Sequence, residues 1–536
     1  MDHVNFQSPM ENIRRFFRRH PILGDTLRWA LPALLIGAVL RILLTSYLPY
    51  ACWGGDAESY YSFAYKLFHD GAISLGPKRR YLYPILMVPV SLLPGGPLRW
   101  LPFFQHTFGL ITLLPLAYTI RKTLVLWRFW IVPITVIYAG LPITIWCEHE
   151  LLGDHLFFAL FVWTFAGWIA WVSQEQLARS RRLFWTFFLP FALFILTKPH
   201  GRFVWPGIFV GFVVAGAWRL LSWKQVVALF LLLAVTPTVG SRKQGAWLFY
   251  DATFPLTQLD TPLHAEYKAE IRDLVGRYRR DIDIYHALQR QEPFYFLRDP
   301  GDQDACPLWK ALGSDERLKN KIYMDLALEG IWARPDLFLY LGLQRVVFDA
   351  NISTFGSGHF ADGSYIESTR ASYADAETDE ENPFRMAFVL PPKGPLPTYE
   401  TFQQKLEPAP GSWRARVVQA CVSSYGQKLD FFRYPAVPRV QYKVSLVHST
   451  YLGWWLFAAM LLSLLPSYRR TLGVWTIIAL GYVFGVYLIS VVNVHYIAPV
   501  WPMLLVLLAV PAEVILLKFT RHDSRGRPVG GRAAIS

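Results

Sequence analysis

Charged residues are scarce in this chain. They make up 17% of its 536 residues, whereas soluble proteins typically carry about a quarter. Apolar residues are correspondingly frequent: they make up 53% of the sequence, and the mean hydropathy is +0.26. This balance argues against a soluble globular protein and directs attention to the long apolar runs.

Cysteine is scarce as well, and no internal repeat is visible. The four cysteines, Cys52, Cys147, Cys306 and Cys421, are too scattered to form a zinc site. A Cys306–Cys421 disulfide and four unpaired thiols are both compatible with the predicted location of these residues outside the cytoplasm. The lack of matching halves argues against a transporter built from inverted repeats.

Several apolar runs approach the roughly 20 residues that a helix needs to cross a bilayer. We predict a polytopic α-helical membrane protein with about ten transmembrane helices, near residues 27–49, 99–120, 129–146, 151–172, 184–197, 203–221, 225–240, 449–466, 471–491 and 495–517. Seven of these spans fall in an N-terminal module, residues 1–240, and three in a C-terminal module, residues 449–536. Residues 241–448 contain no run long enough to span, and we expect a small mixed extracytoplasmic domain with helices on the membrane surface.

Lysine and arginine are distributed unevenly between the predicted loops. With the long segment 241–448 left out, 20 of them lie in residues 1–28, 121–128, 173–183, 218–224, 466–470 and 518–536, against 6 in residues 50–98, 147–150, 198–202 and 492–494. The positive-inside rule therefore places both termini in the cytoplasm and the first outer loop, residues 50–98, outside. The net charge of +14 is explained mainly by this orientation, so no nucleic-acid partner is expected. No cleavable signal peptide is apparent, and a bacterial inner membrane with a site facing the periplasm is favoured.

The first outer loop begins with the stretch GGDAESYYSFAYKL. Asp56 stands at a helix N-cap position, directly after the reversal signal Gly54-Gly55. The residues after it predict a short interfacial helix whose apolar face is formed by Tyr60, Tyr61, Ala64, Leu67 and Phe68. Glu58 would project from the polar face of that helix. On these residues alone, Asp56 either caps the helix or takes part in chemistry.

Further acids and bases gather on the same predicted face. The stretch WCEHELLGDHLFF places Glu148, Glu150 and Asp154 at or inside the membrane edge, where acids are costly and indicate function by default. In the alternative interpretation, Glu148 and Glu150 are solvated and Asp154 pairs with a buried base. Three loops supply polar and cationic side chains: Lys78, Arg79 and Arg80; Lys198, His200 and Arg202; and Asn493, His495 and Tyr496.

Such a combination fits a particular kind of substrate. Cations suit a phosphate, and arginine can contact it with two parallel hydrogen bonds. A carboxylate suits a general base that deprotonates a hydroxyl or an amine. A substrate with a phosphate head and a lipid tail would lie at this depth, so the residues favour group transfer from a lipid-linked phosphate. Positive charge near lipid headgroups also has simpler uses.

The order of these segments resembles the membrane-embedded GT-C glycosyltransferases. The resemblance is to the branch of protein O-mannosyltransferases and lipid A aminoarabinose transferases, which use polyprenyl-phosphate sugars. The segments that carry it are GGDAESYYSFAYKL, RRYLYPILMVP, GDHLFF, LTKPHG, SRKQGAWLFYDATFPL, DLALEGIWARPDLFLYLGLQRVVF and HYIAPVWPML. Residues 351–445 do not share it.

The resemblance implies a role for individual residues. Asp56 would be the catalytic base and Asp154 the second acid, with Glu150 as the competitor for that second role. The donor phosphate would be contacted by Arg80, Lys198 and His495, and by the neighbouring Arg79 and Arg202. The substrate pocket would be lined by Glu58, Tyr60, Tyr83, His200 and Tyr496. Two positions depart from the family: the second acid is often Glu rather than Asp154, and His495 replaces a common Arg, so its phosphate contact depends on protonation.

The implied reaction inverts the anomeric carbon of a sugar carried by a polyprenyl-phosphate donor. A base takes a proton from an extracytoplasmic acceptor (a cell-envelope glycolipid, a polysaccharide or a protein), and the basic cluster stabilises the leaving lipid phosphate. No cofactor is required and no metal ligands are assigned, although a divalent cation bridging Asp56 and Asp154 stays open. The alternatives are a transporter or flippase of lipid-linked sugars and a structural membrane protein.

Overall fold

The computed structural model describes most of the membrane part of the chain and pieces of the remainder. The described residues are 21–47, 49–52, 57–69, 71, 82–94, 96–174, 181–197, 201–235, 260–269, 315–336, 338–339, 374, 378, 398–406, 409–416, 454–489 and 498–520. Within these ranges the chain is almost entirely helical and contains no strand, only one isolated β-bridge.

Four described helices are long and apolar enough to cross a membrane. They are α2 (Pro21–Tyr47), α5 (Gly96–Thr123), α8 (Asp154–Val172) and α26 (Trp501–Thr520), the last preceded by the 3-10 turn η9 (Ala498–Val500). At a rise of about 1.5 Å per residue, a helix of about 20 residues matches the roughly 30 Å of a bilayer core. These helices make the chain a helical membrane protein, as the composition predicted.

The other apolar helices are shorter. They are α4 (Leu82–Ser91), α6 (Trp127–Ala139), α9 (Arg181–Thr197), α10 (Gly201–Ala217), α11 (Trp223–Val235), a helix at Trp454–Ser463, and α24 (Val474–Ile489), which follows the π-helical turn η8 (Arg469–Gly473). The predicted count of ten spans is therefore not established by the described helices and stays a prediction.

One predicted span is divided in two. We expected a continuous helix over residues 129–146, but α6 ends at Ala139 and a new short helix, α7 (Pro142–His149), begins after a turn at Gly140. Proline has no N–H to donate and is well suited to the first turn of a helix, while the residue before it avoids helical geometry. Leu141 is accordingly extended, with φ −61° and ψ 116°.

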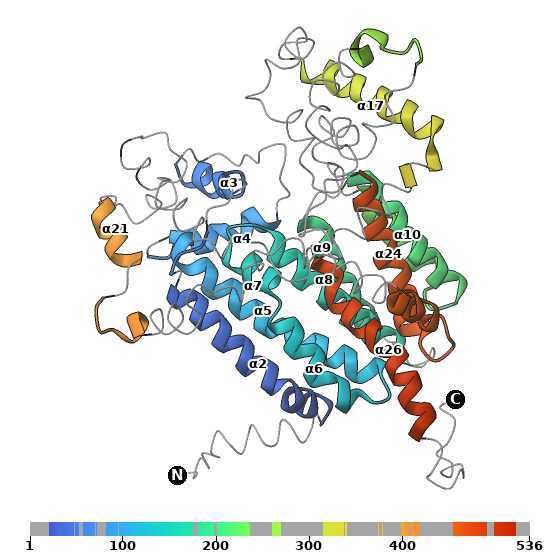
Figure 1. The fold of residues 1–536 in the computed structure, drawn as a ribbon, viewed down its shortest axis with the longest axis horizontal. Coiled ribbons are helices and arrows are strands. Elements are labelled where there is room, and N and C mark those ends of the chain that lie inside the picture. The colour runs from blue at the N-terminus through green and yellow to red at the C-terminus, as the bar shows by residue number, and fades with distance from the viewer. Residues whose placement is uncertain are drawn as a thin grey trace, which may run out of the picture.

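Helix α8 lies at the centre of the bundle and is apolar on all sides, as expected of a buried helix. It packs closely on α9 and α5, and α5 in turn packs on α2 and α6. Helix α2 begins, and α26 ends, on the same side of the bundle (Figure 1). We call the opposite end, where α2 ends and α8 begins, the loop-one end.

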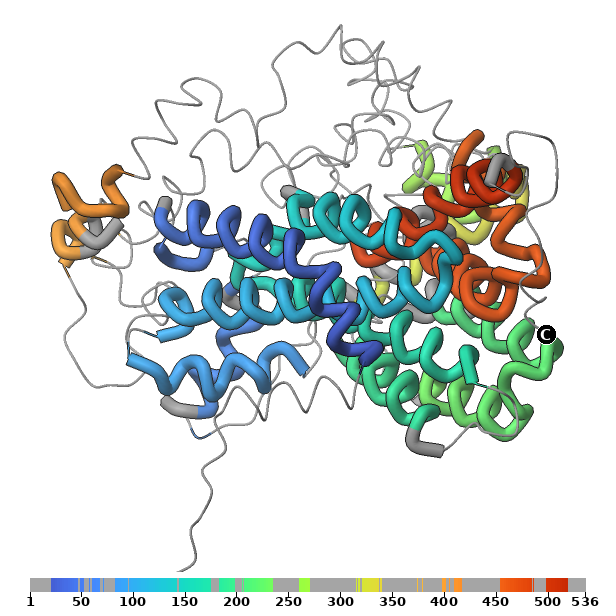
Figure 2. The backbone as a smooth tube through the Cα atoms, turned by 90° about the horizontal axis from the view of Figure 1, so that it is seen from below, coloured from blue at the N-terminus to red at the C-terminus, as the bar shows by residue number. Residues whose placement is uncertain are grey.

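Glycines allow helices of the N-terminal and C-terminal modules to pack closely. Helix α24 packs along α10, and Figure 2 shows the green helices α10 and α11 beside the orange and red C-terminal helices. A Cβ atom added to Gly207 would lie 2.5 Å from the backbone of Gly481, and one added to Gly211 would lie 2.3 Å from the side chain of Ile478. Gly207 and Gly211 form the G-x-x-x-G spacing that lets membrane helices approach each other closely.

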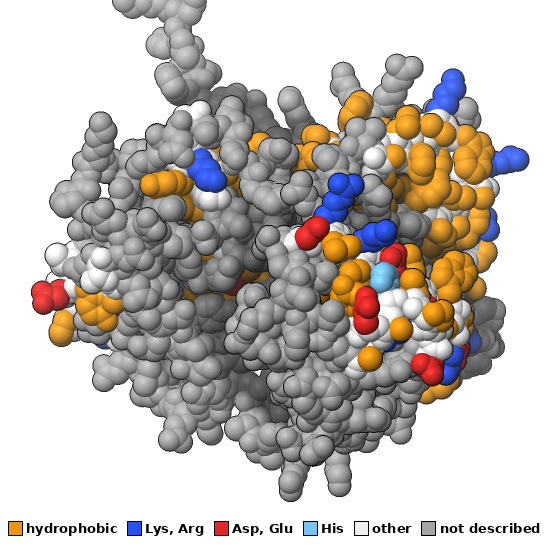
Figure 3. All heavy atoms as spheres, turned by 90° about the horizontal axis from the view of Figure 1, so that it is seen from above, with side chains coloured by type: hydrophobic (Ala, Val, Ile, Leu, Met, Phe, Trp, Pro, Cys, Tyr) orange, Lys and Arg blue, Asp and Glu red, His pale blue; other side chains and the backbone are white. Residues whose placement is uncertain are grey.

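The described parts of the predicted outer domain are helical. Helix α17 (Glu316–Ala333) is capped by Asp315 and contacts residues 260–269 through the ion pairs His264–Asp325 and Lys268–Glu329. Figure 3 shows acidic and basic side chains gathered among hydrophobic ones on this side of the molecule. A second helix, α21 (Tyr399–Leu406), lies apart from it (Figure 1). No strand of the expected mixed domain occurs among the described residues of 241–448.

Candidate functional site

The predicted helix after Asp56 is present as α3 (Ala57–His69). Its buried residues include Tyr60, Tyr61 and Ala64, which confirms these three members of the predicted apolar face, while Leu67 is half-buried and the side chain of Phe68 is outside the described part of the chain. They form a small apolar cluster, separate from the main core, whose buried members are Ala51, Ala57, Tyr60, Tyr61, Ala64, Tyr83, Met87, Leu98, Leu101, Leu151 and Leu152. We call this set the loop-one cluster. It attaches α3 and α4 to the segment that precedes α8.

The backbone just before α3 is fixed to the same segment. The N–H of Cys52 donates to the carbonyl oxygen of His149 at 2.9 Å, and the N–H of Leu151 donates to the carbonyl oxygen of Cys52 at 3.0 Å. Cys52 and Glu150 are therefore partners in a parallel β-bridge. Asp56 lies outside the described residues, but the described residues on either side of it, Cys52 and Ala57, both belong to this end of the bundle.

All three acids of the stretch WCEHELLGDHLFF are buried. Glu148, Glu150 and Asp154 are 0%, 2% and 4% exposed. The alternative in which Glu148 and Glu150 are solvated is therefore wrong. The chain turns at Gly140, before α7 begins at Pro142, and the acids that were expected in a short loop follow within or after this buried helix.

Glu148 is fully compensated by basic side chains. The guanidinium of Arg41 donates two hydrogen bonds to its carboxylate, both at 2.6 Å, and Nδ1 of His106 lies 2.8 Å from Oε2. Burial alone would raise the pKa of Glu148, but Arg41 and His106 lower it to about 2. Gly109 leaves room for this carboxylate, because a Cβ atom there would lie 2.0 Å from Oε1.

The polar contacts of Glu148 continue to the first outer loop. Nε2 of His106 lies 3.1 Å from Nδ1 of His149, and Nε2 of His149 lies 3.0 Å from the carbonyl oxygen of Tyr50. Arg41 and His106 were not predicted as functional residues. A charged residue inside the first apolar run was the signal that could have identified Arg41.

Tyr83 lies near both remaining acids. Burial raises the pKa of Tyr83 well above its ordinary value, and Tyr60, Asp154 and Glu150 add to that effect through their charges. The rings of Tyr60 and Tyr83 meet edge to face at 5.2 Å. The structure therefore brings four predicted site residues together at the loop-one end: Tyr60, Tyr83, Glu150 and Asp154.

The other predicted site residues cannot be placed. Asp56, Arg79, Arg80, Lys198, His200, His495 and Tyr496 lie outside the described residues. Glu58 and Arg202 belong to α3 and α10, but their side chains are not described either. The predicted donor-phosphate cluster thus stays a prediction.

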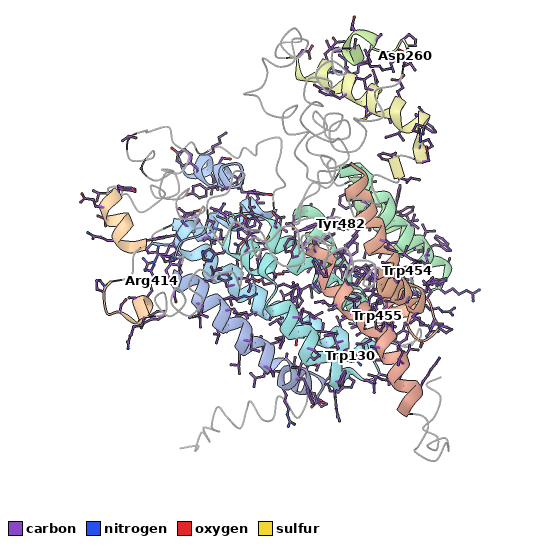
Figure 4. All side chains as sticks on the ribbon, viewed as in Figure 1. Trp130, Asp260, Arg414, Trp454, Trp455 and Tyr482 are labelled. Carbon is purple, nitrogen blue, oxygen red and sulfur yellow. The ribbon has the colours of Figure 1, made fainter. Side chains whose placement is uncertain are left out.

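A piece of the large loop also reaches this end of the bundle. Tyr399 packs against the loop-one cluster, and Nε of Arg414 donates to the carbonyl oxygen of Ser46 at 2.6 Å. Figure 4 shows Arg414 beside the end of α2. Both residues fall in the region 351–445, which the resemblance did not cover.

The described residues contain histidines, cysteines and acids that bear on the metal and disulfide predictions. Among the described residues, no group of three or more His, Cys, Asp or Glu side chains is arranged to hold a metal ion. Cys52 and Cys147 are buried and form no disulfide, whereas Cys306 and Cys421 lie outside the described residues.

No protein-family model matches the chain, and neither a curated protein nor a solved structure matches it.

Proposed function

We propose that this protein is an inverting glycosyltransferase that moves a sugar from a polyprenyl-phosphate donor to an extracytoplasmic acceptor. The acceptor would be a cell-envelope glycolipid, a polysaccharide or a protein. We further propose a GT-C-like arrangement of about ten spans in a bacterial inner membrane, with both termini in the cytoplasm and the site facing the periplasm.

The supporting observation is the burial of two acids beside Tyr83 at one end of an apolar bundle. Glu150 and Asp154 are almost inaccessible, and they lie directly after α7 and at the first residue of α8. Buried acids in a membrane protein are costly and are typically retained for function. Their position at the end of the spans suits a substrate with a polar head and a lipid tail.

In this proposal the acids have different catalytic roles. Asp56, four residues after Cys52, would take the proton of the acceptor, and Asp154 or Glu150 would orient the acceptor or the sugar. Arg79, Arg80, Lys198, Arg202 and His495 would hold the departing phosphate. Tyr60 and Tyr83 would form the wall of the pocket, with Glu58, His200 and Tyr496 as further candidates.

Sugar transfer from a purified polyprenyl-phosphate sugar tests the proposal. The full chain in lipid nanodiscs would be compared with Asp56→Asn, Asp154→Asn and Glu150→Gln. Loss of a general base lowers the rate by roughly 10²- to 10⁴-fold. Asp25→Asn is the matched control, because Asp25 is half-exposed at the start of α2 and pairs with Arg121 at 3.1 Å. We expect it to retain transfer.

Two outcomes would contradict the proposal. If the folded Asp56→Asn protein transfers sugar as fast as wild type, Asp56 is not the base. If wild type moves the donor lipid between leaflets without cleaving the sugar from its phosphate, the protein is a flippase.

A further inference from the structure

Gln105 links the candidate acids to the pocket wall, although sequence analysis did not single it out. It lies in α5 and is 5% exposed. Its Nε2 donates to the carbonyl oxygens of Glu148 and Glu150, both at 2.9 Å, and its Oε1 accepts from the hydroxyl of Tyr83 at 3.1 Å. We propose that Gln105 is a positioning residue for Glu150, an inference that rests on the proposed glycosyltransferase function.

These partners leave only one orientation for the amide. Backbone carbonyls can only accept, so both N–H groups of Nε2 must face them, and the oxygen must face the Tyr83 hydroxyl. No other uncharged side chain of this length offers two donors and one acceptor. Glutamate would place an acceptor against two acceptors, and methionine would offer neither group.

The hydrogen bonds hold the backbone on either side of His149. Glu150 is fixed at its carbonyl by Gln105, and its neighbour Leu151 is fixed by the carbonyl oxygen of Cys52 at 3.0 Å. Loss of the Gln105 amide would remove a donor from both carbonyls, and the carbonyl oxygen of Glu150 would keep only the N–H of Leu152, at 2.8 Å. A buried carbonyl that loses a donor is costly, so the backbone is expected to shift.

A shift at Glu150 would be transmitted to the second acid. Only residues 151–153 separate Glu150 from Asp154, the first residue of α8. In this segment Gly153 faces Tyr83 and Tyr60, because a Cβ atom at Gly153 would lie 3.5 Å from each. A misplacement of about 1 Å can lower an enzymatic rate about 100-fold. Gln105 therefore controls the spacing of Glu150, Asp154 and Tyr83.

A double-mutant cycle separates this role from a general loss of stability. Gln105→Met keeps the length of the side chain and removes its hydrogen bonds. Thr119→Val is the matched control: Thr119 is buried in the same helix, and its hydroxyl donates only to the carbonyl oxygen of Pro115 at 2.9 Å. We expect Gln105→Met to lower kcat roughly 10- to 100-fold in wild type, but by less than about threefold in the Glu150→Gln, Asp154→Asn background, because the residue acts through these two acids.

A second measurement needs no sugar transfer. Cys52 is buried, and burial, with the charge of Glu150, raises the pKa of its thiol, so it should react slowly with a maleimide. In the full chain with the other three cysteines replaced by serine, Gln105→Met should accelerate alkylation of Cys52 at least tenfold, and Thr119→Val should not. If Gln105→Met fails to fold, Gln105→Asn, which keeps the amide but shortens its reach, takes its place.

The outcomes distinguish the two proposals. If wild type transfers no sugar, the proposed function fails, while the alkylation rates still test the anchoring of Cys52 and Glu150. If wild type transfers sugar and the effect of Gln105→Met simply multiplies with that of the double change Glu150→Gln, Asp154→Asn, the positioning role is overturned. Equal alkylation rates in Gln105→Met and Thr119→Val would overturn it as well.

Discussion

Replacing Arg41 by methionine would leave Glu148 as an uncompensated charge inside the bundle. Arg41 is 4% exposed. Its guanidinium donates two hydrogen bonds to the Glu148 carboxylate and one each to the carbonyl oxygens of Gly37 and Ala139. These bonds join α2 to the end of α6 and to α7. Methionine fills much of the same volume without any of them.

The expected cost follows from the burial of both partners. Removing one partner of a buried ion pair typically destabilises a protein by about 3–5 kcal/mol. The lost bond to Ala139 adds about 1 kcal/mol, since that carbonyl lies at the end of α6 and has few other donors. We therefore expect Arg41→Met to lower the free energy of unfolding by about 4–6 kcal/mol.

Reversible unfolding in mixed micelles measures this value. The double variant Arg41→Met, Glu148→Gln removes the unpaired charge as well, so it should be more stable than Arg41→Met alone by about 2 kcal/mol or more. The control is Arg121→Met, which breaks the partly exposed pair with Asp25 between α5 and α2 and should cost about 0–1 kcal/mol from that pair. If the double variant loses the sum of the two single effects, the burial of an unpaired charge is not the cause.

Three further predictions concern the charge of Glu148 and the close contacts of two glycines. Because the pKa of Glu148 is lowered from 4.5 to about 2, its contribution to stability should be present above pH 4.5 and be lost as pH falls towards 2; unfolding midpoints of wild type and Glu148→Gln should therefore converge over this range. Gly109→Ala places a Cβ atom 2.0 Å from the Glu148 carboxylate and should cost about 1–3 kcal/mol, whereas Gly140→Ala, whose nearest neighbour is 3.4 Å away, should be tolerated; equal stability of the two variants would contradict this geometry. Gly207→Val should separate α10 from α24, which would be detected as a lower unfolding temperature and faster proteolysis, with Gly140→Ala as the control that meets no close neighbour; an unchanged melting temperature would refute the close glycine contact.

The sequence predicted what depends on local pattern. The period of Tyr60, Tyr61 and Ala64 was enough to predict α3 and its buried face, because the spacing of side chains on a helix is fixed. The four long helices follow in the same way from their apolar length. Asp154 was predicted at the start of an apolar span and is the first residue of α8. A charged residue directly before an apolar run indicates where the helix begins.

Contacts between distant segments could not be predicted in this way. Arg41 and Glu148 are 107 residues apart, and no pattern in either segment indicates the other. Gln105 is a polar residue within an apolar run, and only the approach of residues 148–150 gives it a role. The break between α6 and α7 was visible as Gly140 and Pro142, but it was outweighed by the apolar composition around it.

The three acids of WCEHELLGDH differ in what they can do chemically. A general base works best when its pKa lies near the working pH. Glu148, held at a pKa of about 2 by Arg41 and His106, is too weak a base for this and is committed to joining helices. Glu150 and Asp154 lie in the following residues, near Tyr83. By joining α7 to α2 through Arg41, Glu148 fixes the position of the segment that carries Glu150 and Asp154.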